Sequence, residues 1–244
     1  RGLLHAVKAG ETVGMALRMA FSDWAGGPEC RKAGKTVLRA AKEGIADPGS
    51  WANGALMRIS PVAIYSHLMG YERNEAAVLA YDVARLTHGH PFATFPAVES
   101  VMAILSILRG DKNIPKYLSK PIAFCWDWQT DPGYRYAEYA EYRNASVYAC
   151  HPTTGIMTWQ HVFNLALELH DGEPWSKIPT FEDGMVKVLW ECFDKDTTGA
   201  VAGALLGTYW GESGIPERWK AGVEKGEEIV KIADELIDGC LREN

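Results

Sequence analysis

Apolar residues recur along this chain at the three- and four-residue spacing that places side chains on one face of an α-helix. One apolar stripe runs from Thr12 to Trp24 and ends at Gly26-Gly27-Pro28, and a short amphipathic pattern from Lys35 to Lys42 stops at Gly44. The same periodicity predicts helices over residues 55–68 (broken or capped around Pro61), 74–86 (with Asn74 as its cap), 95–108, 157–170, 184–193, 217–222 and 226–240.

Signals for β-strands are almost absent, because no Asn-Gly turn stands between alternating segments and runs of β-branched residues are short. The segment 115–152 has a looser pattern rich in Trp and Tyr, and we expect short helices and loops on one surface there. We find no linker and no internal repeat. The sequence therefore predicts one all-α domain over residues 1–244.

Composition and charge exclude several classes of protein. With a net charge of −6 and a pI near 5.7, the chain has no Lys/Arg cluster that would follow a phosphate backbone, so we expect no nucleic-acid partner. Five scattered cysteines without a Cys-x-x-Cys pair favour reduced thiols over a disulfide framework or a zinc site. No apolar run approaches the roughly 18 residues of a membrane span, and the first residues are not those of a signal peptide. We expect a cytoplasmic protein.

The strongest candidate for chemistry is the run Asp194-Lys195-Asp196-Thr197-Thr198-Gly199-Ala200. Two carboxylates and a hydroxyl, from Asp194, Asp196 and Thr197, are the oxygen donors that Mg²⁺ and other hard cations prefer. Glycines on one face of the following helix predict that another helix packs very close to it; they are Gly199, Gly203 and Gly207. From the spacing alone, a metal site and a plain helix cap by Asp196 or Thr197 both remain open.

A second candidate is the polar loop Ser50-Trp51-Ala52-Asn53-Gly54, which precedes an apolar helix. Backbone N–H groups at a helix start, with a glycine that allows close approach, suit a diphosphate. Trp51 beside them is placed to stack on a base or to pack over a ribose. The alternative is a capped turn, with Asn53 as the N-cap and Arg58 paired to a surface acid.

The turn Thr87-His88-Gly89-His90-Pro91 suggests a metal pair at first sight. Two histidines at positions i and i+2 of such a turn seldom converge on one ion without a third ligand. We interpret His88 as a hydrogen-bond donor to a substrate hydroxyl or as a structural histidine of the turn. The dipeptide His170-Asp171 is too weak a signal for a phosphohydrolase, and the Trp and Tyr residues of segment 126–148 are interpreted as packing or partner surface.

In this order, the motifs resemble those of the ADP-ribosylglycohydrolase family, which includes the dinitrogenase-reductase-activating glycohydrolases and the ADP-ribosyl-acceptor hydrolases. The resemblance covers roughly residues 10–240, and its last block is the most specific. It rests on Ser50–Arg58, on Leu86-Thr87-His88, on Asp194–Ala200 and on the closing run Gly203–Trp219.

The resemblance implies an all-α hydrolase with two bound Mg²⁺ ions, or Mn²⁺ in their place. Such an enzyme cleaves the bond between the anomeric carbon of ADP-ribose and an acceptor, so the partner would be an ADP-ribosylated protein or a small ADP-ribosyl substrate. Asp194, Asp196 and Thr197 would bind metal, and His88 would contact the nucleotide side. The diphosphate and the distal ribose would be lined by Ser50, Trp51, Asn53 and Gly54.

One part of the family pattern has no counterpart here. Family members carry near their N-terminus a Gly-Asp-rich segment with an acidic residue and then a Thr-Asp-Asp-Thr motif, which supply the other metal ligands. This chain has no Asp-Asp pair, and Arg1–Gly10 is similar to the segment that follows that motif. We expect the catalytic acidic residue upstream of Arg1. The alternative is a degenerate member that binds ADP-ribose or has a structural role, because three protein donors hold two magnesium ions poorly.

Overall fold

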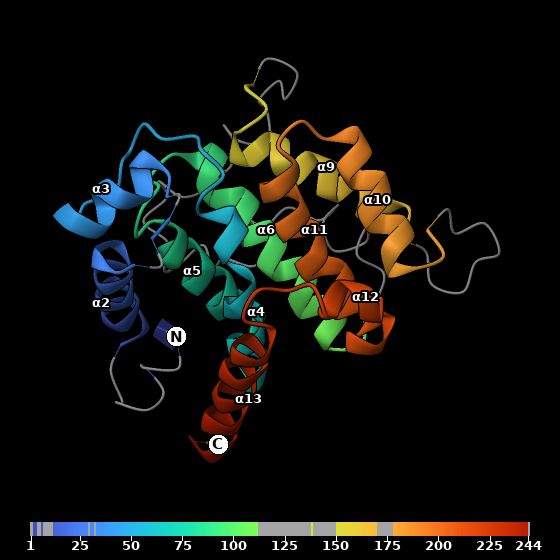
Figure 1. The fold of residues 1–244 in the computed structure, drawn as a ribbon. Helices are drawn as coiled ribbons and strands as arrows, with labels where there is room; N and C mark the ends of the chain where they lie inside the picture. Colours follow the sequence, from blue (N-terminus) through green and yellow to red (C-terminus); the bar gives the residue numbers. More distant parts are fainter. Residues whose placement is uncertain are drawn as a thin grey trace.

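The computed structural model describes residues 2–3, 6, 12–28, 30–31, 33–111, 138, 150–169 and 178–243 (Figure 1). Within these ranges the regular structure is helical, and β-type pairing is limited to two isolated bridges, Asp47 with His88 and Ala52 with Thr154. The predicted all-α fold is confirmed. The aromatic residues from Trp126 to Tyr148 and the dipeptide His170-Asp171 lie outside the described residues.

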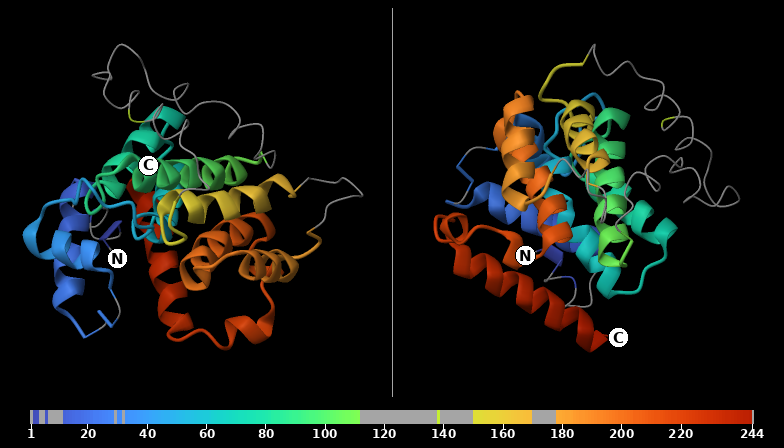
Figure 2. Two further views of the ribbon diagram at one scale, coloured as in Figure 1. Left: turned by 90° about the horizontal axis from the view of Figure 1, so that it is seen from above. Right: turned by 90° about the vertical axis from the view of Figure 1, so that its right-hand side faces the viewer.

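Helix α6 (Pro91–Leu108) is the centre of the fold, and almost every one of its side chains is buried. A helix that is apolar all round needs other helices on every side. Around it pack α4 (Ser60–Leu68), α5 (Arg73–Ala84), α9 (Gly155–Leu167) and α11 (Lys195–Trp210). Figure 2 shows α6, α9 and α11 side by side. The helix begins four residues before the predicted Phe95, because Pro91 fits the first helical turn and the His90 ring accepts the Phe92 N–H.

By length and composition α6 could cross a membrane, contrary to the prediction that no apolar run approaches that length. Its burial explains the composition, because 94% of the helix lies inside the protein. The one acidic side chain in it, Glu99, accepts a hydrogen bond of 2.6 Å from the Trp159 indole nitrogen of α9. A carboxyl group at this depth needs such a donor.

The other helices cover the centre from the sides. Helices α2 (Val13–Gly26) and α3 (Lys35–Glu43) pack on each other, and α10 (Phe181–Glu191) packs on α9 and α11. A short 3₁₀ helix, η4 (Glu212–Gly214), and α12 (Glu217–Lys220) follow α11, and α13 (Gly226–Glu243) then packs on α4.

Several other helix starts differ from the prediction. Helix α9 begins at Gly155 instead of residue 157, and α10 begins at Phe181 instead of residue 184. Helix α5 begins at Arg73, and its cap is Glu72 rather than Asn74: Glu72 and Glu75 form a reciprocal capping box that satisfies two backbone N–H groups. The segment after the Asn53-Gly54 loop is a three-residue 3₁₀ helix, η1 (Leu56–Arg58), and α4 starts separately at Ser60 with Pro61 in its first turn. The predicted break around Pro61 is therefore confirmed.

The glycine stripe of α11 is packed less closely than its spacing predicts. A Cβ atom on Gly199 would lie 3.2 Å from Leu189 of α10, one on Gly203 would lie 3.8 Å from Met185, and one on Gly207 would meet nothing within 4 Å. A closer approach of one helix to the backbone of another is at Gly155, where a Cβ atom would lie 2.6 Å from the Phe92 carbonyl oxygen of α6. This contact fixes the start of α9 on the start of α6.

We therefore expect Gly155→Ala to destabilise the protein by about 2 kcal/mol, because the added methyl group meets backbone that cannot move aside. The matched variant Gly207→Ala, in open space within a helix, should be neutral or stabilising by up to about 1 kcal/mol. Urea unfolding of both variants measures the difference, and equal effects would contradict the described contact.

Candidate functional site

The Asn53 side chain joins the two motifs that the sequence singled out. Its Nδ2 group donates to the Asp194 Oδ2 atom at 2.7 Å and to the Thr158 hydroxyl of α9 at 2.9 Å. Asn53 is 7% exposed, so its amide needs these partners. The contact brings the 50–54 loop onto the start of α11, across 141 residues of sequence.

The Asp194 side chain does not cap α11, although Asp194 occupies the N-cap position. Its carboxylate instead accepts the Asn53 bond, so a plain helix cap is not its function. Asp196 and Thr197 lie in the first turn of the helix, where Asp196 Oδ1 accepts the Thr197 N–H at 2.9 Å. Asp194 is half-buried, Asp196 is exposed and Thr197 is buried. Thus the three predicted metal ligands share one helix start.

The ligand atoms at this helix start are of the type that binds a hard cation, but there are too few of them to fill its coordination shell. Two carboxylates and a hydroxyl are suitable ligands for Mg²⁺, which usually keeps several waters. Within the described part of the chain, however, no three His, Cys, Asp or Glu side chains group closely enough to hold a metal. Asp194, Asp196 and Thr197 are therefore at most part of a coordination shell, and they remain predicted ligands.

The 50–54 loop is fixed by backbone hydrogen bonds to the segment before α9. The Asn53 N–H donates to the Thr153 carbonyl at 3.1 Å, and the Gly155 N–H donates to the Trp51 carbonyl at 2.9 Å. The Ser50 hydroxyl lies 3.0 Å from that of Thr36 in α3. The helical segment directly after this loop is the three-residue η1 rather than the predicted helix over residues 55–68, so little helix dipole supports the loop. The anion site at the loop N–H groups stays a prediction.

The Trp51 ring is 40% exposed and lies in an aromatic cluster. Its centroid is 4.7 Å from those of His90 and Phe92. The two histidines of the 87–91 turn do not converge, since His90 contacts Trp51 and caps α6 while His88 is buried behind Gly54. A metal pair at this turn is excluded by that arrangement.

His88 and Arg58 form a buried polar group beneath the loop. The Thr87 hydroxyl lies 2.7 Å from His88 Nδ1 and accepts a bond of 2.7 Å from Arg58 Nη2. Burial, and secondarily the Arg58 charge, lower the pKa of His88 to about 4, and burial lowers the pKa of Arg58 to about 10. The alternative in which Arg58 pairs with a surface acid is contradicted: no carboxylate of the described residues pairs with its guanidinium, which lies over the Phe21 ring.

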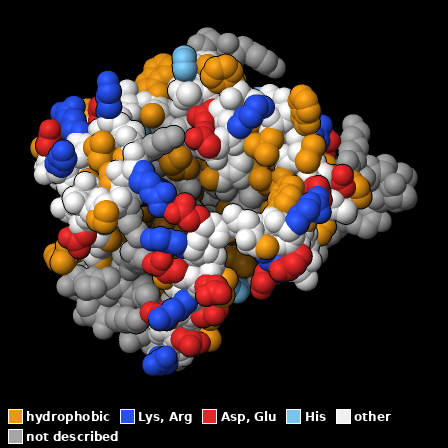
Figure 3. Space-filling view, in the orientation of Figure 1, with side chains coloured by type: hydrophobic (Ala, Val, Ile, Leu, Met, Phe, Trp, Pro, Cys, Tyr) orange, Lys and Arg blue, Asp and Glu red, His pale blue; other side chains and the backbone are white. Residues whose placement is uncertain are grey.

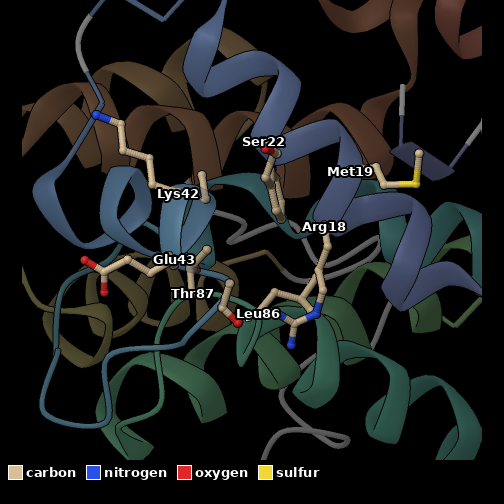
Figure 4. Close-up of a pocket in the computed structure, with 11 residues that line it drawn as sticks. Arg18, Met19, Ser22, Lys42, Glu43, Leu86 and Thr87 are labelled. Atoms are coloured by element: carbon tan, nitrogen blue, oxygen red, sulfur yellow. Dashed lines mark hydrogen bonds between the residues drawn. The ribbon is translucent and has the colours of Figure 1, made fainter.

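A pocket of about 380 Å³ lies between α2, α3 and the end of α5. Figure 4 shows Arg18 reaching from α2 toward Leu86 and Thr87 at its floor. Neither Asn53 nor Asp194 lines this pocket, so the pocket is separate from the contact between the two motifs. Of the three hydrogen-bonded residues Arg58, Thr87 and His88, only Thr87 lines it.

Apolar side chains gather beside the Asp194 motif. Figure 3 shows them over α10, whose outward face carries Val186 and Trp190, and Phe193 follows directly before Asp194. Trp190 is 82% exposed and Phe193 is 75% exposed. The sequence analysis did not identify this surface, nor Thr158 as a partner of Asn53. It named Thr87 within a motif but gave its hydroxyl no role, because its partners are brought to it only by the fold.

The structure is therefore that of an all-α protein with an oxygen-rich site. In this site the Asn53-Gly54 loop contacts a helix start that carries two carboxylates. The chain belongs to the ADP-ribosylglycohydrolase family, whose pattern it matches over residues 1–244. This confirms the family resemblance and supports, in general terms, a hydrolase of the ADP-ribosylglycohydrolase type that acts on ADP-ribosylated substrates.

The structure is also similar to that of an "ADP-ribosylglycohydrolase-related protein complex", with a TM-score of 0.66. The similarity covers 98% of this chain and 77% of the other, and at 21% sequence identity it shows a shared fold alone. No curated protein matches the chain in sequence.

Asn53→Ala should lower the free energy of unfolding by about 2 kcal/mol, because it removes the donor of a charged hydrogen bond and leaves the Thr158 hydroxyl without its partner. Asn164→Ala is the matched control: Asn164 also forms a side-chain bond, to Gln160, but on the exposed face of α9. Chemical unfolding compares them, and an Asn53→Ala effect no larger than the control would argue against the junction.

The depressed pKa of His88 predicts an acid-sensitive contribution to stability. Because the folded pKa, about 4, lies below the ordinary value of about 6.5, the unfolded chain binds the proton first. This stability is therefore complete above about pH 6.5 and is lost as the pH falls toward about 4. Between about pH 7 and pH 5 the wild type should lose about 2 kcal/mol more than His88→Gln. Parallel pH curves would contradict the buried neutral ring.

Proposed function

We propose that this protein is a magnesium-dependent hydrolase that releases ADP-ribose from an ADP-ribosylated protein by cleaving the bond at the ribose anomeric carbon. The observation that carries the proposal is the 2.7 Å hydrogen bond from Asn53 to Asp194. It joins, in one place, a loop suited to a nucleotide and a pair of carboxylates suited to a cation. Membership of the ADP-ribosylglycohydrolase family supports the same chemistry.

The loop would hold the ADP-ribose through its backbone and through Trp51. Among the described residues, the N–H groups of Ala52 and Gly54 have no hydrogen-bond partner, so they are free to donate to diphosphate oxygens. The partly exposed Trp51 ring, supported from behind by His90 and Phe92, offers a flat apolar face to a base or a ribose. Ser50 would contribute indirectly, since its hydroxyl fixes the loop to α3.

The carboxylates of Asp194 and Asp196, with the Thr197 hydroxyl, would hold magnesium together with water and donors outside this helix turn. A bound cation of this kind orients ribose hydroxyls and makes a neighbouring water a better nucleophile. Asn53 keeps the Asp194 carboxylate in place while adding no charge, so the negative charge stays available to a cation.

In the reaction, the bond between the anomeric carbon and the acceptor atom breaks, and the oxygen of a water molecule forms the new bond to that carbon. One water proton goes to the departing acceptor group, so no oxidant, reductant or further reactant is needed. Binding energy from the diphosphate and the base would hold the ribose in place for this step.

The surface beside the carboxylates favours a protein as the acceptor. Val186, Trp190 and Phe193 expose a row of large apolar side chains next to Asp194 (Figure 3). Exposed apolar patches of this kind commonly mark contacts with other proteins. A small acceptor would have no use for such a surface.

The test is release of free ADP-ribose from a panel of proteins that carry the modification on different side chains, with Mg²⁺ or with a chelator. We expect release only with the metal. Asp194→Ala should lower the rate by at least roughly 100-fold, and Asn53→Ala by roughly 10- to 100-fold as the partner of a metal ligand. The control Asp238→Ala changes an exposed carboxylate on α13 and should leave the rate unchanged.

Equal rates with magnesium and with chelator, or an Asp194→Ala variant as fast as the wild type, would overturn the proposal. A chain that binds ADP-ribose tightly without releasing it from any substrate would instead support the alternative, a binding protein without catalysis. The specific observation in favour of that alternative is the incomplete set of metal ligands among the described residues.

A further inference from the structure

Behind the loop, three side chains form a hydrogen-bonded series to which the proposed reaction assigns no step. Arg58 Nη2 donates to the Thr87 hydroxyl at 2.7 Å, and that hydroxyl lies 2.7 Å from Nδ1 of His88. Thr87 and His88 are each 1% exposed. Water therefore has little access to the contact between them, and the Thr87 hydroxyl and His88 Nδ1 have to satisfy each other.

The series determines which nitrogen of His88 carries the proton. A guanidinium can only donate, so the Thr87 hydroxyl accepts from Arg58 and keeps its own proton to donate. Among the described residues, the other polar atom within hydrogen-bond distance of that hydroxyl is His88 Nδ1, so the hydroxyl proton has a partner only when Nδ1 acts as an acceptor. In a neutral imidazole the single proton is consequently on Nε2.

The Nε2 atom is directed toward the substrate loop. A Cβ atom on Gly54 would lie 3.2 Å from Nε2 and 3.0 Å from the neighbouring Cε1, so the ring faces the glycine directly. Within the described ranges, Nε2 has no hydrogen-bond partner. A nearly buried N–H group without a partner is costly unless something occupies the position in front of it.

Arg58 is held in place by three contacts that do not involve a carboxylate. Its guanidinium lies 4.5 Å from the centroid of the Phe21 ring, and its Nη2 group reaches the Val83 carbonyl at 3.3 Å as well as Thr87. Its Nε atom is buried without a partner. A buried cation that no acid neutralises adds little stability of its own, so its orienting effect on Thr87 is the more informative property.

We infer that Arg58 and Thr87 are positioning residues that hold His88 as the Nε2–H tautomer, so that the nucleotide contact which the family resemblance implies for this histidine is made by an N–H donor beside Gly54. The identity of the ligand rests on the proposed function, whereas the tautomer is a property of the free protein. The neutral state follows from the same environment, because burial and the Arg58 charge both oppose protonation of the ring.

Nitrogen NMR of the full chain with ¹⁵N-labelled histidine tests the tautomer directly. The His88 signals are assigned by their loss in His88→Gln. We expect a protonated Nε2 and an unprotonated Nδ1 in the wild type and in Thr87→Ser, which keeps the hydroxyl. Thr87→Val and Arg58→Met should populate the Nδ1–H form. His151, whose Nδ1 atom lies 2.9 Å from the exposed Thr153 hydroxyl, is the internal reference and should not change.

A wild-type His88 protonated on Nδ1, or variants whose spectra keep the wild-type tautomer, would overturn the inference without reference to any ligand. Calorimetric titration with ADP-ribose then tests the ligand. Thr87→Val and Arg58→Met should bind about tenfold more weakly and Thr87→Ser about as well as the wild type. Unchanged affinity in variants with an altered tautomer would overturn the contact with ADP-ribose. If the wild type binds none, the proposed function fails, while the NMR result still decides the tautomer.

Discussion

The site depends on one interaction, the hydrogen bond from the buried Asn53 amide to the Asp194 carboxylate. A buried amide needs hydrogen-bond partners, and here its Nδ2 group donates both to Thr158 of α9 and to Asp194, the N-cap residue of α11. The start of α9 is in turn fixed by the contact of Gly155 with the backbone of α6. The central helix therefore determines, through α9, where the loop lies and which carboxylate it reaches.

The loop lies between two charged side chains, a carboxylate on one side and a guanidinium on the other, and neither has an oppositely charged partner among the described residues. On one side Asp194 has a neutral partner, so its negative charge is not cancelled by a cation of the described residues. On the other side the partly buried Arg58 lies next to Thr87 without a paired acid among the described residues. A ligand with a diphosphate and an accompanying divalent cation would complement both sides, which is the chemistry that we propose for this family member.

The sequence predicted the helices well where the cause is local. The stop of α3 at Gly44 follows from a left-handed residue with φ of 69°, and the break near Pro61 follows from the missing N–H group of proline. Local signals were insufficient at Asn74, because Glu72 and Glu75 form a better cap, and at residues 55–59, where the chain forms a 3₁₀ turn instead of a continuous helix. The core helix α6 was predicted too short because Pro91 was taken as part of the preceding turn.

The candidate residues of the site were recognisable by type, but their partners were not. Nothing in the sequence near Thr158 or Thr87 indicates that one receives the Asn53 amide and the other connects Arg58 with His88, since those pairings arise only when distant helices pack. The same holds for the environment of Arg58: one alternative placed it at the surface beside an acid, whereas its guanidinium lies over the Phe21 ring.

The most direct test of the account is a double-mutant cycle on ADP-ribose binding in the presence of Mg²⁺, with Asn53→Ala, Asp194→Ala and the double variant. If the two residues act as one unit, the double variant should bind about as weakly as the weaker single variant, which gives a coupling energy of about 1 kcal/mol or more. Losses that simply add would show that the loop and the carboxylates act independently, and would contradict the central role of their hydrogen bond.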